Sequence, residues 1–566
     1  MIYMCKYTPI ELLKAYGLDL VLPNREVEDL SEADTLIHSN VCSHARQLLM
    51  ASTGEEDLFL TNCCDSIRRV ADTVETLEKR ESRVIMMDLP HTEGSCAVDK
   101  LYRELKKLKT GLEAKGRSFD KDRFLKEWQQ TASDFDMKKT AMTAGPYIAV
   151  MGARGGENLH KSIWRTMPYP TVDLTCLGAR NLYFPPGISA DMAEDDLLKL
   201  YAAELLRQLP CMRMAEVGSR RSLLLDPNLA GIIYNTIRFC DYYEFEYAGL
   251  RRETSVPILK IETDYTLQTQ GQLLTRLEAF AEAFGIKKEA GNKKKDEKKA
   301  MTDHPIYIGI DSGSTTTNAV ALNEKEEIVA FSIVRTGAKS GISAENALKE
   351  ICEKSGLSRE DMVHICATGY GRAHITFADS EKTEITCHAR GAHYLDPKAR
   401  PVIDIGGQDS KVICLDEEGH VANFIMNDKC AAGTGRFLEM MARTLEMPLS
   451  DMAEEGLKWK KDMTISSTCT VFAESEVISL IAENTETADI IHALNKAVAV
   501  RIGAMVSRAG GKAPYMMAGG VARNKSCAAE IEEKIGDKLF IAEHPDLGGA
   551  IGAALFAKEA ANGGEG

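Results

Sequence analysis

Long apolar runs and an excess of positive charge are both missing from this sequence of 566 residues. No apolar stretch reaches the length of about 18 residues that would span a membrane. The N-terminus also lacks the basic-then-apolar order of a secretory signal, so we predict a cytoplasmic protein. The formal net charge of −15 excludes general nucleic-acid binding, because such binding needs a basic face.

Aromatic residues are also few, at 6%, whereas the hydrophobic fraction of 44% is typical of a soluble globular protein. The length predicts about three or four domains. Disulfides are rare in the cytoplasm, so the 15 cysteines predict metal or cluster ligation for some thiols. We expect others to be small buried packing residues. These are Cys352, Cys366, Cys414 and Cys527.

One sharp break in composition divides the chain into residues 1–286 and 305–560. Residues 287–304 are rich in lysine and have no apolar periodicity, which predicts a solvated linker. The first half alternates short strands with helices, which predicts two parallel α/β lobes of the flavodoxin or Rossmann kind, at about 1–95 and 145–286. A charged helical insert at 98–139 separates them. The expected strands are Leu18–Pro23, Leu58–Cys63, Arg83–Pro90, Tyr147–Ala153, Gly231–Cys240 and Val256–Tyr265.

Loops that carry cysteines follow or adjoin several of these strands. Cys64 and Cys240 each stand between a strand and an aspartate that could cap the next helix, and Cys42 lies in another such loop. Ligands gather at the carboxyl ends of parallel strands, and a helix N-terminus stabilises a thiolate. The three cysteines together predict a three-thiolate site, while packing as buried thiols would explain each one separately.

Two cysteines of the second half stand before predicted helices. Small residues follow Cys430, after which Phe437, Met441 and Leu445 recur at helical spacing, and Cys469 precedes an apolar run. A cubane iron–sulfur cluster commonly takes four thiolates, so two cysteines are half a site. A symmetric homodimer in which each chain supplies both cysteines would complete it. The alternative is that both are buried structural cysteines.

Two segments of the second half, 308–322 and 402–415, are strands that end in an aspartate, turn tightly and return. Turns of Gly, Ser and Thr offer N–H groups and hydroxyls to phosphates, while the aspartates can hold magnesium through water. A later glycine pair allows close approach of an adenosine. We assign catalysis to Asp311, Asp404 and Gln408, and nucleotide binding to Ser312, Gly313, Ser314, Thr315, Thr316, Gly406, Gly407, Gly519 and Gly520.

With ATGYGR (367–372), EITCHARGA (384–392) and the segments around Cys430 and Cys469, residues 305–558 resemble a known family. It comprises the ATP-dependent activators of 2-hydroxyacyl-CoA dehydratases and benzoyl-CoA reductases. The resemblance implies a two-lobed actin/Hsp70-like (ribonuclease H-like) ATPase that uses Mg²⁺ and ATP. It also implies a 4Fe–4S cluster between two chains, held by Cys430 and Cys469, with a ferredoxin or flavodoxin as electron donor and sensitivity to air.

The first half is similar to the cluster-bearing subunit of 2-hydroxyacyl-CoA dehydratases over roughly residues 5–284. NVCSHAR, NCCDSIRR, VIMMDLP and RFCDYYEFE carry this resemblance. It implies a second 4Fe–4S cluster on Cys42, Cys64 and Cys240. The chain is short for such a subunit, and its Cys63–Cys64 doublet leaves open which of the two is a ligand. A double-cubane cluster that uses Cys63 as well is the alternative.

Three functions are compatible with these patterns. The first is ATP-driven electron transfer to a dehydratase-type cluster in the chain's own first half or in a partner dehydratase or reductase. The second is a complete reductase or dehydratase in one chain, acting on a small molecule or an acyl-CoA. The third is a redox-silent ATPase of the sugar-kinase or chaperone kind, against which no sugar-binding feature is evident. We expect no nucleic-acid partner.

Overall fold

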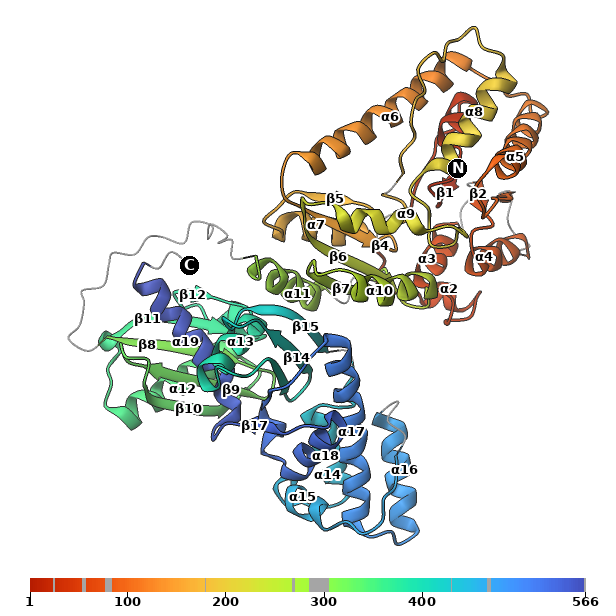
Figure 1. Ribbon diagram of the computed structural model, residues 1–566. Coiled ribbons are helices and arrows are strands. Elements are labelled where there is room, and N and C mark those ends of the chain that lie inside the picture. Colours follow the sequence, from red (N-terminus) through yellow and green to blue (C-terminus); the bar gives the residue numbers. More distant parts are fainter. Residues whose placement is uncertain are drawn as a thin grey trace. The chain divides into compact units, whose positions relative to one another are not determined.

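The computed structural model describes residues 1–23, 26–52, 57–76, 84–178, 180–266, 270–284, 305–428, 430–465 and 470–563. The lysine-rich segment 287–304 therefore lies outside the described residues. The chain divides into two compact units, Met1–Leu277 and Glu278–Gly566 (Figure 1).

The first unit contains two parallel sheets. One has the order β1-β2-β3, and the other has the order β5-β4-β6-β7. Their strands are β1 (Ile2–Tyr3), β2 (Leu58–Thr61), β3 (Val84–Met87), β4 (Tyr147–Gly152), β5 (Thr171–Asp173), β6 (Leu229–Ile237) and β7 (Ile258–Thr263).

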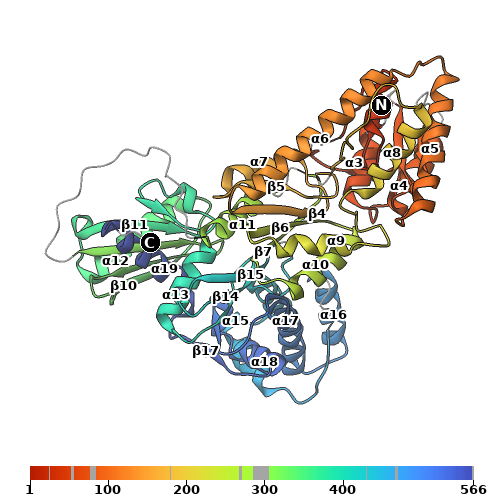
Figure 2. The ribbon, with the colours of Figure 1, turned by 45° about the horizontal axis from the view of Figure 1, so that its top comes forward.

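Helices surround both sheets of this unit. In α4 (Asp65–Thr76) the buried residues Ile67, Val70, Ala71 and Val74 recur at helical spacing, so one face of the helix packs on the core. Figures 1 and 2 both show α5 (Ser95–Glu113) beside α8 (Glu194–Arg207). The other helices are α1 (Ile10–Ala15), α2 (Ser31–Asp34), α3 (Ser43–Ala51), α6 (Lys121–Thr143), α7 (Glu157–Thr166), α9 (Gly218–Arg221) and α10 (Asp241–Glu253), while α11 (Gln270–Glu282) includes the boundary between the two units.

The predicted strand Leu18–Pro23 was wrong. Only Val21 pairs there, in a single bridge with Ile2, while Tyr3 N–H donates to the Val21 carbonyl oxygen. The place beside β2 is instead taken by β1, whose two residues are too few to give a periodic signal. The short β5 was missed for the same reason, whereas the other five predicted strands and the helical insert are present.

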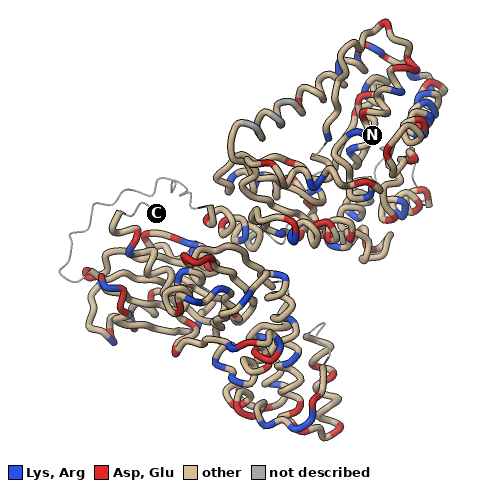
Figure 3. The backbone as a smooth tube through the Cα atoms, viewed as in Figure 1, with Lys and Arg blue, Asp and Glu red and all other residues tan. Residues whose placement is uncertain are grey.

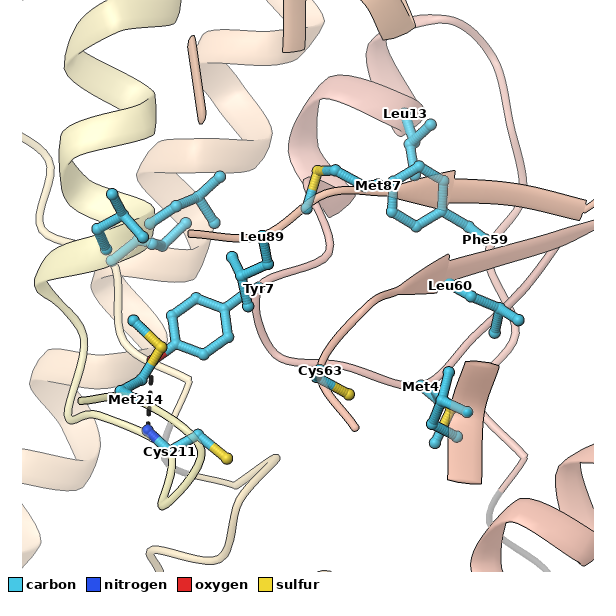
Figure 4. Packing of buried hydrophobic residues seen from close by; sticks show 14 of the residues in the cluster. Met4, Tyr7, Leu13, Phe59, Leu60, Cys63, Met87, Leu89, Cys211 and Met214 are labelled. Atoms are coloured by element: carbon cyan, nitrogen blue, oxygen red, sulfur yellow. Dashed lines mark hydrogen bonds between the residues drawn. The ribbon is translucent and has the colours of Figure 1, made fainter. Parts of the chain in front are cut away.

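Apolar side chains from both sheets of the first unit form one buried cluster. Figure 4 shows its part around Tyr7, Leu13 and Phe59, with the thiols of Cys63 and Cys211 at the lower edge, away from Leu13 and Phe59. The Cys211 N–H donates to the Tyr7 hydroxyl over 3.3 Å, which fixes this loop against the core.

The second unit contains two five-stranded sheets of the same design. Their orders are β10-β9-β8-β11-β12 and β15-β14-β13-β16-β17. In each sheet the first three strands in sequence are antiparallel, and the last two run parallel to the first. The strands are β8 (Ile306–Ser312), β9 (Thr316–Leu322), β10 (Ile328–Arg335), β11 (Met362–Thr368), β12 (Ser380–Glu381), β13 (Pro401–Ile405), β14 (Ser410–Leu415), β15 (Val421–Asn427), β16 (Tyr515–Ala518) and β17 (Leu539–Ile541).

Helices cover these sheets and complete the two-lobed actin/Hsp70-like fold, so the predicted fold class is confirmed. The pair α13 (Glu384–Leu395) and α19 (Gly548–Ala561) pack on each other, and α19 also lies against β8. The remaining helices are α12 (Ser340–Ser355), α14 (Gly435–Thr444), α15 (Leu449–Glu455), α16 (Thr470–Ala482), α17 (Thr487–Ala509) and α18 (Lys525–Ile535).

Among the described residues, α17 is long and apolar enough to cross a membrane by length and composition. However, 67% of its apolar window is buried, and it packs against β14 and α18 as a core helix. Figure 3 shows basic and acidic residues interspersed along both units, with several basic residues on α5.

Candidate cluster and nucleotide sites

The predicted cysteine ligands of the first unit stand at helix starts. Cys42 and Cys240 occupy the N-cap positions of α3 and α10, and Cys64 directly precedes α4. We expected Asp65 and Asp241 to cap the helices that follow Cys64 and Cys240. Instead Asp65 and Asp241 are the first helical residues, where their charge still favours the helix dipole.

These three thiols line one cavity at the carboxyl ends of the strands. It encloses about 710 Å³ that protein atoms do not fill, part of which is open solvent. Seven cysteines line it: Cys5, Cys42, Cys63, Cys64, Cys176, Cys211 and Cys240. The structure thus brings together the four cysteines that the sequence indicated and adds three more.

Two of the three added cysteines follow the same rule that identified the others. Cys5 lies just after β1 and Cys176 just after β5, the two strands that were too short to predict. Because these two strands were not predicted, the position of Cys5 and Cys176 after a strand could not be recognised. Cys211 lies after α8, in a loop that no periodic pattern marks.

Most of these thiols are held neutral. Burial raises the pKa of Cys42 and Cys176, and it raises that of Cys240 to about 12. The hydrogen bond between Cys63 and Cys5 raises the pKa of Cys63 to about 12 and lowers that of Cys5. Hydrogen bonding to Cys63, together with burial, raises the pKa of the adjacent Cys64.

Cationic side chains line the same cavity. Arg213 directs its two terminal nitrogens toward the sulfurs of Cys211 and Cys240, each at 3.8 Å. Burial opposes ionisation of the Cys211 thiol, but the charges of Arg213 and Lys6 lower its pKa overall. Burial lowers the pKa of Lys6 to about 8. Burial, together with the charges of neighbouring arginines, lowers the pKa of His44 to about 3.

This donor set fits an anionic cluster better than a single metal ion. In the described parts of the chain no three His, Cys, Asp or Glu side chains converge on one ion. A cubane does not need such convergence, because each iron takes its own thiolate. The buried cations would offset the negative charge of a thiolate-bound cluster.

The predicted nucleotide-binding turns of the second unit lie together. In the β8–β9 turn the Gly313 N–H donates to the Thr316 carbonyl, and in the β13–β14 turn Gly406 N–H donates to Asp409 O, at 2.9 and 3.0 Å. A Cβ atom on Gly407 would overlap the Thr315 hydroxyl, so the two turns touch. Gln408 is exposed at the second turn.

His388 of α13 joins the two predicted catalytic aspartates. Its Nε2 lies 3.4 Å from Asp311 Oδ2, and its Nδ1 lies 3.8 Å from Asp404 Oδ1. Burial opposes the charged imidazole, but both aspartates raise the pKa of His388 to about 9. The charges of His388 and Lys411 lower the pKa of Asp404 against the effect of burial.

Lys411 extends this buried charge cluster. Its Nζ lies 2.9 Å from Asp409 Oδ1, 3.2 Å from Asp404 Oδ2 and 3.8 Å from Glu384 Oε1. Burial raises the pKa of Glu384 to about 7. Sequence reasoning missed these roles, although the EITCHARGA motif spaces Glu384 and His388 four residues apart on one helical face.

The predicted glycine pair also reaches this cluster. Gly519 follows β16 with a φ of +82°, and a Cβ atom there would lie 2.5 Å from the Ile405 carbonyl oxygen and 2.7 Å from Asp404 Oδ1. Only glycine allows this approach. Nearby, Ser312 Oγ and Glu384 Oε1 are buried without a hydrogen-bond partner in the described structure.

Of the two predicted interface cysteines, Cys430 lies within the described residues. Cys430 does not open a helix, because α14 begins at Gly435 after an N-cap at Thr434. Cys469 lies outside the described residues, and α16 begins at the next position. The first N–H groups of α14, those of Gly435 and Arg436, donate to the carbonyls of Gly406 and Gly407 at 2.9 and 2.8 Å.

Comparison with known proteins agrees with this division. Residues 308–557 match the family model of the BadF/BadG/BcrA/BcrD ATPases. The chain is also 43% identical over 250 residues to a 2-hydroxyisocaproyl-CoA dehydratase activator from Clostridioides difficile, and this match covers 94% of that protein and 44% of this chain. The chain belongs to the BadF/BadG/BcrA/BcrD ATPase family. Its first half matches a second model, the 2-hydroxyglutaryl-CoA dehydratase D-component, over residues 5–149 and 155–284.

Two further comparisons with activator ATPases cover a similar share of the chain. The activating ATPase of (R)-2-hydroxyglutaryl-CoA dehydratase from Acidaminococcus fermentans is 46% identical over 254 residues, with 97% of that protein and 44% of this chain covered. A solved structure of the C. difficile activator with bound ADPNP is 42% identical and has a TM-score of 0.44; the match covers 96% of that chain and 46% of this one. The two family models confirm both family resemblances predicted from the sequence.

Proposed function

We propose that this chain couples ATP hydrolysis to low-potential one-electron transfer. Cys430 and Cys469 of two chains would hold a shared 4Fe–4S cluster, and the cysteine cavity of the first unit would hold the acceptor. Iron–sulfur clusters supply one-electron chemistry when bound at such thiolates. The names of the relatives, which are dehydratase activators, support this role.

The observation that carries the proposal is the cavity lined by seven cysteines in the same chain as the ATPase fold. A redox-silent kinase or chaperone has no use for such a cavity. Linking the two units in one chain also raises the effective concentration of one for the other. The cytoplasmic location, the ferredoxin or flavodoxin donor and the domain limits 1–286, 287–304 and 305–560 belong to the same proposal.

ATP turnover would rely on the buried charge cluster. Asp311 and Asp404 would support magnesium, while the Gly and Ser N–H groups of the two turns would contact the phosphates. The Gly406 and Gly407 carbonyls then connect the second turn to the start of α14, which follows the Cys430 loop. This hydrogen-bonded path supports coupling between nucleotide and cluster, provided that ATP binds the two states of the path with different affinity.

A single-chain reductase with a double-cubane cluster is the second candidate. The cavity offers more thiols than the three expected for one open cubane, and Cys63 is among them. This surplus favours a larger cluster that uses Cys63 together with Cys64. The N-terminal site would then perform substrate chemistry itself.

An iron count on the anaerobically purified chain tests both candidates. A shared cubane plus one cubane in the cavity predicts about six irons per chain, and a double cubane predicts about ten. Replacing both Cys42 and Cys240 by Ser should remove the cavity's share, whereas Cys352→Ser should not. Electron paramagnetic resonance should show the cavity signal appearing only when MgATP is added to reduced protein.

A count near two would contradict a cluster in the cavity. A cavity signal that appears equally with and without ATP would contradict the coupling. Asp404→Asn separates the two outcomes, because it should leave the iron content unchanged while it lowers ATP turnover severely.

A further inference from the structure

Arg154 is a buried cation for which the described residues supply no counter-ion. It follows β4 at the carboxyl end of the sheet and is only 4% exposed. Its backbone is fixed, since its N–H donates to Cys176 Sγ over 3.3 Å and its carbonyl accepts from Tyr265. Yet neither terminal guanidinium nitrogen has a hydrogen-bond partner in the described structure. Burying an unpaired charge is costly, so this arrangement calls for an anion from outside.

A second cavity lies on the other side of Arg154. It encloses about 890 Å³ of unfilled space, including open solvent. Arg154 and Leu177 line both this cavity and the cysteine cavity, so the two share a wall. An anion held by Arg154 would therefore lie beside the thiols.

The other charged groups of the second cavity already have partners. Lys161 Nζ lies 2.6 Å from Glu157 Oε1, and His160 Nε2 lies 3.9 Å from Asp173 Oδ2. Asp173 Oδ1 also accepts hydrogen bonds from the N–H and hydroxyl of Thr175.

The N-terminus of α7, which borders this cavity, is already occupied. Its Asn158 N–H donates to the carboxylate of Glu26 over 3.0 Å. An incoming anion is thus directed to Arg154 and not to the helix dipole.

The remaining walls are apolar. Leu22 and Leu177 line the cavity, and Trp164 beside them is 75% exposed. Such walls accommodate a carbon skeleton, as in most small-molecule sites, where a few polar groups fix the orientation.

We propose that this second cavity binds a small oxyanion, with the charged group on Arg154 and the carbon portion against Leu22, Leu177 and Trp164. The inference rests on the proposed function, because it places a ligand next to the cavity that would hold the cluster. Carboxylates and phosphates share this chemistry, and the apolar walls favour a carboxylate.

Anaerobic titration calorimetry of the whole chain tests the site with three probes: butyrate, its neutral amide and inorganic phosphate. Butyrate should bind saturably and the amide should not. Arg154→Gln should weaken butyrate binding at least about tenfold, because a charge-assisted hydrogen-bonded pair is lost. Arg154→Lys should keep part of the affinity. Arg165→Gln is the matched control, since it removes an exposed charge from α7 that lines neither cavity.

Phosphate binding that depends on Arg154 would support the site with phosphate as its ligand group. Equal affinity of wild type and Arg154→Gln, or no saturable binding of either anion by the wild type, would overturn the inference. Arg154 would then serve only as a counter-charge for the cysteine cavity. The measurement needs neither ATP nor reduction, so its failure is distinct from failure of electron transfer.

Discussion

Glu11 is a fully buried carboxylate whose charge is compensated locally. Its oxygens accept hydrogen bonds from Thr131, Arg180 and Tyr201, and the Arg180 Nη2 contact measures 2.5 Å. Burial opposes ionisation, but these partners outweigh it and lower the pKa of Glu11 below its usual 4.5. A lowered folded pKa stabilises the fold above the unfolded pKa, and this contribution is lost as pH falls through the folded value.

Glu11→Gln should therefore destabilise the first unit at neutral pH by roughly 3–5 kcal/mol, because it leaves Arg180 buried without its counter-charge. The difference from wild type should shrink as pH falls below about 4.5. Thermal unfolding followed by calorimetry from neutral to acid pH measures this. Glu127→Gln, which breaks the partly exposed pair with Lys14, should cost less than about 1 kcal/mol. Equal losses in both variants would contradict the role of burial.

At the scale of single elements, the start of α14 connects the predicted nucleotide-binding turn at Gly406 and Gly407 to the Cys430 loop. The Arg436 N–H lies in the first helical turn, so it has no partner within the helix and donates to Gly407. Arg436→Pro removes this donor while proline remains tolerated in a first turn. Arg436→Ala is the matched control, because it keeps the N–H.

The measurement is the rate at which a chelator extracts iron from the proposed cluster at Cys430, compared between ATP and ADP. We expect Arg436→Pro to reduce the ratio of these two rates by about fivefold. That factor corresponds to the ~1 kcal/mol of one hydrogen bond. Arg436→Ala should behave like wild type, and ATP affinity should change little in either. An unchanged ATP effect in the proline variant would exclude this path.

Element length also explains what the sequence could predict. Strands such as β2 and β6 carry enough consecutive apolar residues to be recognised, and Cys64 and Cys240 were found because they follow these two strands. β1 and β5 have only two and three residues, so Cys5 and Cys176 were missed with them. His388 was missed for another reason: its position between Asp311 and Asp404 depends on the packing of α13 against α19, which brings together residues far apart in the sequence.

At the scale of the whole molecule, α16 presents an apolar face to solvent. Val471, Ile478 and Ile481 share one side of the helix, and with Phe472 beside them they are 64, 55, 42 and 67% exposed. The helix begins directly after Cys469, one of the two cysteines that would need a second chain to complete a cubane. A second copy of the chain that contributes the other two thiolates would cover this face.

Ile478→Glu should therefore convert a dimer to monomers and remove about two irons per chain. Losing one buried isoleucine costs about 1.5–3 kcal/mol, and a buried carboxylate adds to that, so the dimer should weaken by at least tenfold. Anaerobic light scattering with iron analysis measures both effects in one sample. Leu225→Glu, at an 83% exposed leucine of the first unit, introduces the same charge and should change neither quantity. A dimer that persists in Ile478→Glu with full iron content would contradict a shared cluster next to α16. A monomer with full iron content would mean that each chain completes its own cluster.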